Sequence, residues 1–85
     1  MEIQYLQRFK KQFKKLPSKI QDQFEERLRL FITNPNDPRL RIHPLKGNYQ
    51  GYWSMNVNGD IRAIYTIKEE SIIIFGLIGS HSQLY

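Results

Sequence analysis

The apolar positions of this chain change their spacing near its middle, from a helical period to a strand period. A short alternating stretch at residues 2–6 indicates a first strand. Apolar side chains then recur at three- and four-residue steps over residues 6–16 and again over residues 20–31. Because this spacing gathers them on one side of a helix, the pattern predicts two amphipathic helices.

The corner between the two predicted helices is short. Pro17 ends the first helix, and Ser18, followed three residues later by Gln21, has the form of a capping box that begins the second. The second helix stops before Asn34-Pro35. Two helices joined in this way are expected to pack as an antiparallel hairpin.

From residue 49 onward the apolar period is two. Residues 52–57 and 61–67 alternate in character on either side of an Asn58-Gly59-Asp60 turn, which predicts a β-hairpin. Residues 72–78 are apolar on both faces, as expected of a central strand.

The register of this hairpin follows from its apolar face. A two-residue Asn-Gly turn would place Met55 opposite Arg62 and mix core and polar residues. A one-residue slip exchanges the two faces of a strand, so we expect an odd-length, bulged turn instead. That turn pairs Val57 with Ile61, Met55 with Ala63, and Trp53 with Tyr65. The opposite face then carries Ser54, Asn56, Arg62 and Ile64.

The predicted elements follow in the order βααβββ, which indicates an α+β fold. We expect a single domain over residues 1–85, with the helix hairpin packed on one face of an antiparallel sheet. The other face of the sheet is then available for a ligand.

Basic charge is concentrated at the start of the chain. Thirteen Lys and Arg against eight Asp and Glu give a formal charge of +5, and residues 1–20 hold six basic residues against one acidic residue. The first predicted helix contributes Lys10, Lys11, Lys14 and Lys15. Such a stripe attracts polyanions such as nucleic acids, but a lysine-rich solvated helix face has the same composition. Charge alone leaves both interpretations open.

Composition argues against several kinds of site and location. The chain has no cysteine and only two histidines, 38 positions apart, so we expect no disulfide, no bound metal and no cofactor. The apolar run at 72–78 is far shorter than the roughly 20 residues of a membrane-spanning helix. The first residues lack the layout of a signal peptide, so we expect a cytoplasmic protein.

The candidate chemistry lies in the second half of the chain. Taken singly, each polar residue there has an ordinary interpretation: Asp60 as a turn residue, Arg62 as half of an ion pair, the histidines as surface groups. Together they are the groups that a metal-free ribonuclease needs. One imidazole or carboxylate removes the ribose 2′-OH proton, a second group protonates the leaving 5′-oxygen, and cations stabilise the phosphorane-like transition state. The candidates are His43, Lys46, Asp60, Arg62, His81 and Tyr85.

Four segments give the sequence a family resemblance. They are H-P-L-K-G at 43–47, G-Y-W-S at 51–54, D-I-R-A-I-Y at 60–65 and I-G-S-H-S-Q-L-Y at 78–85. With this spacing the whole chain resembles the RelE/ParE superfamily of type II toxin–antitoxin toxins, most closely the YafQ-like and YoeB-like mRNA interferases. The resemblance implies a RelE-like βααβββ fold, cleavage of mRNA in the ribosomal A site through the 2′-OH to a 2′,3′-cyclic phosphate, and neutralisation by a cognate antitoxin.

The resemblance also implies roles for individual residues. By position, His81, His43, Asp60, Arg62 and Tyr85 match catalytic residues of the family. The groups expected to contact RNA or the ribosome are Lys46, Asn56 and the helix lysines Lys10, Lys11, Lys14 and Lys15.

The chain departs from the YafQ-like pattern at two positions. Asn56 stands where that group has a histidine, and Ile61 where it has a tryptophan. Asn56 cannot carry a proton at neutral pH, so any acid–base duty at that place must fall to His43, Asp60 or His81. Two alternatives remain: a ParE-like inhibitor of DNA gyrase without RNase activity, and an inactive toxin that retains antitoxin binding.

Overall fold

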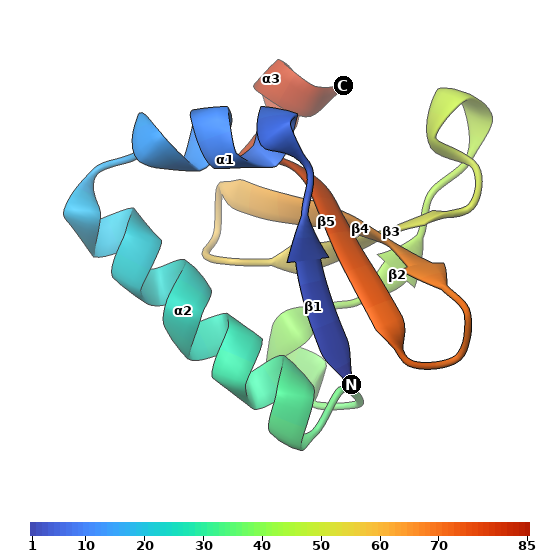
Figure 1. The fold of residues 1–85 in the computed structure, drawn as a ribbon. Coiled ribbons are helices and arrows are strands. Elements are labelled where there is room, and N and C mark those ends of the chain that lie inside the picture. Colours follow the sequence, from blue (N-terminus) through green and yellow to red (C-terminus); the bar gives the residue numbers. More distant parts are fainter.

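The computed structural model describes residues 1–85 as two helices packed on one face of a five-stranded sheet (Figure 1). The long helices are α1 (Gln7–Lys14) and α2 (Ser18–Thr33), and a short α3 (His81–Leu84) follows the last strand. The strands are β1 (Glu2–Tyr5), β2 (His43–Pro44), β3 (Tyr52–Asn56), β4 (Ile61–Lys68) and β5 (Ile72–Ser80). Two 3₁₀ turns, η1 (Pro38–Leu40) and η2 (Gly47–Tyr49), flank β2. No helix is long and apolar enough to cross a membrane.

The strands lie in the order β1-β5-β4-β3-β2, which makes the apolar β5 an interior strand as predicted. The pairs β5–β4, β4–β3 and β3–β2 are antiparallel, but β1 runs parallel to β5. The sheet is therefore mixed rather than wholly antiparallel. A parallel neighbour requires a long crossover connection, and the two helices are part of the chain that carries it from β1 to the rest of the sheet.

The predicted hairpin register is confirmed. Trp53 lies opposite Tyr65 and Met55 opposite Ala63, and the Val57 N–H donates to the Ile61 carbonyl at 2.9 Å. Asn58 closes the turn, because its Oδ1 accepts the backbone N–H groups of Asp60 and Ile61, each at 2.8 Å.

A β-bulge at Gly76 changes the alternation along β5. Tyr65 pairs with Phe75 and Ile64 with Leu77, so Gly76 has no partner on β4. A bulge moves the following residues to the opposite faces. As a result, Leu77 and Gly79 share a face with Ile64 and Arg62, and the chain leaves the sheet beside that face.

The main core lies between the helices and the sheet. Phe24 and Phe75 are at its centre, with ring centroids 5.4 Å apart, and both are fully buried. The two helices open as a V from the corner that joins them (Figure 1) and meet through Phe9, Phe13 and Phe24. The buried core residues are Phe9, Phe24, Leu28, Phe31, Leu40, Met55, Val57, Ile61, Ala63, Tyr65, Ile73, Phe75 and Ile78.

The expected capping box at the helix corner is wrong. Ser18 makes no capping hydrogen bond, and the Gln21 amide instead donates to the carbonyls of Phe13 and Leu16 at 3.0 and 3.2 Å. Gln21 thereby satisfies the carbonyl end of α1 rather than the N–H end of α2. The capping box of this fold is at Ser80 and Gln83, where α3 begins.

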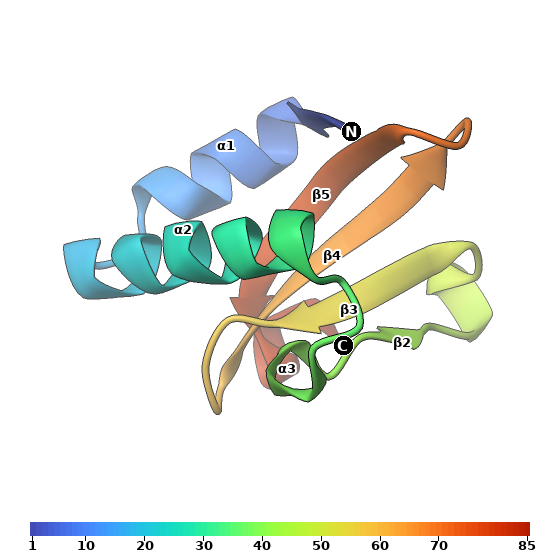
Figure 2. The same ribbon diagram turned by 90° about the horizontal axis from the view of Figure 1, so that it is seen from below.

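The other face of the sheet is partly covered. Ile64, Leu77 and Leu84 form a small second cluster, against which Leu45, Tyr49 and Tyr52 pack. Leu84 belongs to α3, so α3 lies on the face opposite α1 and α2, which Figure 2 shows together on one side of β5 and β4. The α3 turn and the loop that contains η2 therefore leave a cleft rather than an open face.

Candidate active site

A cleft of about 460 Å³ lies on this second face, between the η2 loop and α3. It brings together five of the six residues that the sequence marks as candidate chemistry, from segments far apart in the chain. No acidic residue lines it, and nowhere in the molecule do three or more His, Cys, Asp or Glu side chains gather as a metal site would require. The lining residues are His43, Leu45, Lys46, Tyr49, Ser54, Arg62, His81 and Tyr85.

The tail of the chain is held against the cleft by polar and aromatic contacts. Gln83 N–H donates to Ser80 Oγ at 3.3 Å, and Ser80 N–H donates to Gln83 Oε1 at 2.8 Å, so α3 begins immediately after β5. The Tyr49 hydroxyl donates to the Leu84 carbonyl at 2.9 Å. The His81 and Tyr85 rings lie with centroids 4.7 Å apart. These contacts place the His81 imidazole at the cleft.

The tautomer of His43 follows from its hydrogen bond. Its Nδ1 lies 3.0 Å from the carbonyl oxygen of Arg41. A carbonyl oxygen can only accept, so Nδ1 carries the proton and Nε2 of the neutral ring is left as an acceptor. The backbone of Arg41 adopts the left-handed conformation, with φ of +46°, which is uncommon for residues other than glycine. The backbone at Arg41 therefore orients an imidazole that can accept a proton.

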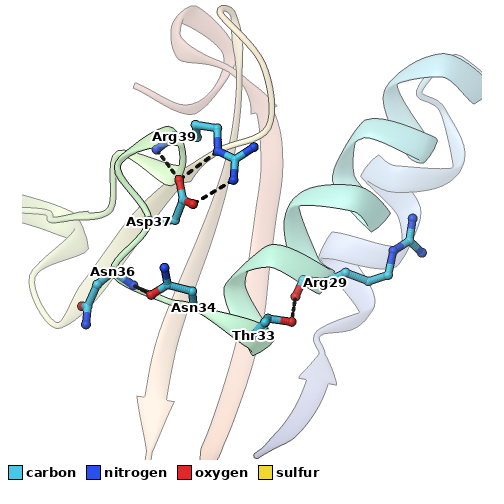
Figure 3. Close-up of polar contacts among 6 residues, drawn as sticks. All are labelled: Arg29, Thr33, Asn34, Asn36, Asp37 and Arg39. Carbon is cyan, nitrogen blue, oxygen red and sulfur yellow. Dashed lines mark hydrogen bonds and ion pairs between the residues drawn. The ribbon is translucent and has the colours of Figure 1, made fainter.

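Arg62 contributes a guanidinium with no carboxylate partner. Its Nη1 donates to the Asn58 carbonyl at 3.1 Å, while the molecule's ion pair joins Arg39 to Asp37 at 2.9 Å (Figure 3). The ion pair considered from sequence, between Arg62 and Asp60 or a glutamate, is therefore not formed. A half-buried arginine with free N–H donors suits a phosphate, which it can bind in a bidentate fork.

Ser54 belongs to the cleft although the sequence analysis gave it no chemical role. It is fully buried, and its Oγ has no hydrogen-bond partner in the protein. It lies opposite His43 on β2 and Ile64 on β4. A buried hydroxyl without a partner is unfavourable, so the protein leaves one polar group at the wall of the cleft unsatisfied. Its position on the polar face was predicted, but its complete burial was not.

Other predicted residues lie outside the cleft. Asp60 is an exposed residue of the β3–β4 turn, so the geometry does not support a catalytic role for it. Asn56 lines an adjacent pocket that shares Arg62 with the cleft.

The lysines of α1 are also apart from the cleft. Lys10 and Lys14 border a groove between the helices that is lined by Tyr5, Phe9, Phe13, Phe24 and Glu25. Lys11 and Lys15 line neither this groove nor the cleft.

Four groups, all outside the cleft, have shifted pKa values. Burial raises the pKa of Tyr5, and the hydrogen bond to Asp37 raises the pKa of Arg39. Three hydrogen bonds from Arg39, two of them from the side chain, lower the pKa of Asp37 to about 2. Burial raises the pKa of Tyr65 to about 12.

Comparison with known proteins gives a match over the whole chain. The family model described as "Bacterial toxin of type II toxin-antitoxin system, YafQ" matches residues 1–85. Toxin YoeB of Synechocystis sp. is 34% identical over 47 residues, which span 55% of this chain and about half, 55%, of that protein.

Solved structures share the fold. YafQ from E. coli is similar with a TM-score of 0.84 and 24% identity, covering 99% of this chain and 97% of that one. A chain of the E. coli DinJ–YafQ toxin–antitoxin complex is similar with a TM-score of 0.80 and 24% identity, covering 99% and 96% of the two chains. These likenesses confirm the predicted RelE-like α+β fold.

Proposed function

The chain belongs to the YafQ family of toxins of type II toxin–antitoxin systems, and from this membership we propose that it is a ribosome-dependent endoribonuclease that cleaves mRNA. The observation that carries the proposal is the composition of the cleft. Two imidazoles, a guanidinium and an ammonium group converge there, and no acidic side chain is among the lining residues. That set suits a phosphodiester, which is anionic and needs one proton removed and one supplied during cleavage.

In the proposed reaction His43 is the general base. Its Nε2 accepts the proton of the ribose 2′-OH, because Nδ1–H is held by the Arg41 carbonyl. The 2′-oxygen attacks the adjacent phosphorus and the bond to the 5′-oxygen breaks, leaving a 2′,3′-cyclic phosphate. His81 donates a proton to the 5′-oxygen as it leaves. The reaction requires a 2′-OH, so it is restricted to RNA.

Three other residues support this chemistry. Arg62 and Lys46 stabilise the charge that builds on the phosphoryl oxygens. The buried Ser54 hydroxyl gains in the bound substrate the hydrogen-bond partner that it lacks in the free protein. Tyr85, which is 49% exposed, packs on His81 and presents a ring face on which a base can stack.

We also propose two kinds of partner. A family defined by type II toxin–antitoxin systems, with a DinJ–YafQ complex of the same fold, supports a cognate antitoxin that neutralises this chain. The exposed lysines of α1 support contact with ribosomal RNA at a distance from the cleft, and this contact should weaken as salt rises.

Replacing each histidine tests the assignment. His81→Ala and His43→Ala are each expected to lower cleavage of mRNA on programmed ribosomes by roughly 10²–10⁴-fold and to relieve growth arrest. Ser82→Ala in the same short helix is the matched control, because Ser82 does not line the cleft. Asp60→Asn is expected to cut at a rate close to that of the wild type. Circular dichroism and antitoxin binding should be unchanged in all four variants.

Primer extension on mRNA after induction separates the alternatives. Discrete cuts in the wild type that disappear in His81→Ala support the proposal. An SOS response without cuts indicates the ParE-like gyrase inhibitor instead. Normal growth on overexpression of the wild type indicates an inactive toxin that only binds its antitoxin. A fully toxic His81→Ala variant contradicts the role given to that imidazole.

A further inference from the structure

A second pocket, of about 240 Å³, adjoins the cleft and is rich in arginine. Its guanidinium groups come from α2, from η1 and the residue after it, and from β4, and no acidic residue lines it. We call it the arginine pocket, and its charged lining residues are Arg27, Arg39, Arg41 and Arg62. Backbone and side chains of the 56–59 segment form the rest of its wall.

Three of the four guanidinium groups lack a neutralising partner. Arg39 is paired with Asp37, which accepts two hydrogen bonds from its side chain (Figure 3). Arg27, Arg41 and Arg62 have no carboxylate within 4.0 Å, since Arg39–Asp37 is the molecule's ion pair at that distance. Like charges gathered in one concave site repel each other, so an anion bound among them is favoured.

Two of these guanidinium groups are held in place by a single turn. Arg27 Nε donates to the Val57 carbonyl at 3.4 Å, and Arg62 Nη1 donates to the Asn58 carbonyl at 3.1 Å. The turn is fixed in its place because Asn58 Nδ2 donates to Gln23 Oε1 of α2 at 2.8 Å. Both arginines are half-buried and keep further N–H donors free, so the pocket is organised before a ligand arrives.

The arginine pocket adjoins the cleft at one shared residue. Arg62 lines both. Arg41 lines the pocket, and its carbonyl accepts the hydrogen bond that orients His43 at the cleft. A phosphate bound between the imidazoles and a phosphate bound in the pocket would therefore both lie beside Arg62.

We propose that the arginine pocket binds the phosphate next to the scissile phosphate in the RNA chain, and so fixes which bond is cut. The proposal rests on the endoribonuclease function proposed above. An RNA phosphate fits better than an acidic peptide, because planar guanidinium forks match phosphate oxygens and because the pocket continues the path of the scissile strand.

The experiment measures coupling between the pocket and one phosphate of the substrate. Three single variants are compared: Arg27→Gln, Arg41→Gly and the control Arg29→Gln. Glycine adopts the φ of +46° at position 41 readily, so Arg41→Gly removes the guanidinium but keeps the carbonyl that holds His43. Arg29 lies on the same helix as Arg27, does not line the pocket, and extends away from Arg39 (Figure 3).

Each variant is assayed on programmed ribosomes with mRNA carrying a single uncharged methylphosphonate on either side of the scissile phosphate. In the wild type and in Arg29→Gln, one of these substitutions should slow cleavage by roughly 10-fold or more. In Arg27→Gln and Arg41→Gly, cleavage of the all-phosphate mRNA should already be slower by a similar factor. The same methylphosphonate should then slow it by less than about 2-fold, because the partner has gone.

The possible outcomes are distinct. If the methylphosphonate effects are as large in the two pocket variants as in the wild type, the pocket does not bind that phosphate and the inference is overturned. If those variants instead lose antitoxin binding, the pocket serves an acidic segment of the antitoxin. A wild type that leaves the all-phosphate mRNA intact contradicts the endoribonuclease itself, and the subsite with it.

Discussion

Ser54→Ala is expected to make the protein more stable and less active at once. The Ser54 side chain is 0% exposed and its Oγ has no hydrogen-bond partner. An unsatisfied buried hydroxyl costs about 1–3 kcal/mol of folding free energy, and alanine removes it while keeping the Cβ. Allowing for the small void that remains, the gain should be roughly 1 kcal/mol. For a domain of this size that corresponds to a melting temperature higher by about 4–8 °C.

The same substitution should weaken the reaction. In the proposed complex the hydroxyl meets a phosphate oxygen, and a hydrogen bond to a charged group contributes about 1.5–3 kcal/mol. Each 1.4 kcal/mol is a factor of ten, so cleavage on programmed ribosomes should fall by roughly 10- to 100-fold. Opposite changes in stability and rate distinguish a substrate contact from a general loss of structure.

Ser80→Ala is the matched control, because it should lower the stability that Ser54→Ala raises. Ser80 Oγ accepts the Gln83 N–H at 3.3 Å as a helix cap, so its loss should lower stability by about 1 kcal/mol. Thermal unfolding followed by circular dichroism measures both variants. The reasoning about Ser54 is refuted if Ser54→Ala melts below the wild type, or if it melts higher and cuts RNA at the full rate.

Three further predictions concern the tail and the core. Tyr49→Phe removes the hydrogen bond to the Leu84 carbonyl at 2.9 Å, so urea unfolding should show a free energy of unfolding lower by about 1 kcal/mol, and RNA cleavage should slow. An unchanged urea midpoint would contradict the role of Tyr49 in anchoring the tail. Gly79→Ala would put a Cβ 2.9 Å from Gln83 Oε1, which displaces this side chain from the Ser80 N–H; stability should fall by roughly 1 kcal/mol, and the NMR signals of His81 should shift while those of Phe24 do not. Burial raises the pKa of Tyr65 to about 12 from an ordinary 10.0, so the unfolded chain loses the phenol proton first. The contribution of Tyr65 to the free energy of unfolding is therefore complete below pH 10 and is lost as the pH rises toward 12. Tyr65→Phe should therefore lose less unfolding free energy over that interval, and parallel pH curves for the two proteins would contradict this.

The local pattern of apolar residues was sufficient to predict strand register where one face of a strand had to be buried. The register of β3 against β4 was predictable because the alternative would have placed Arg62 opposite Met55, and the observed pairing of Met55 with Ala63 confirms it. The parallel pairing of β1 with β5 was not predictable, because alternation in a strand carries no information about the direction of its neighbour. The capping box at Ser18 failed because Gln21 found better partners in the carbonyls of α1.

The candidate site was predicted in part. The resemblance and the residue types marked His43, Lys46, Arg62, His81 and Tyr85, and the structure brings all five to one cleft. Ser54 was missed because serine on a polar face is ordinarily exposed, whereas here it is fully buried in the tertiary structure. The arginine pocket was missed because Arg27 and Arg62 belong to different elements, and hydrogen bonds to the turn after β3 bring them together.

The pairing of the first strand with the last also has a consequence for synthesis. Because β5 lies inside the sheet, between β1 and β4, residues 2–5 have no neighbour to pair with until residues 72–80 have been translated. The second imidazole is made later still. A nascent chain therefore contains its helices early, but it can neither complete its sheet nor place His81 in the cleft before those last residues emerge. Under the function proposed above, the nuclease site is therefore incomplete for as long as the chain is being synthesised.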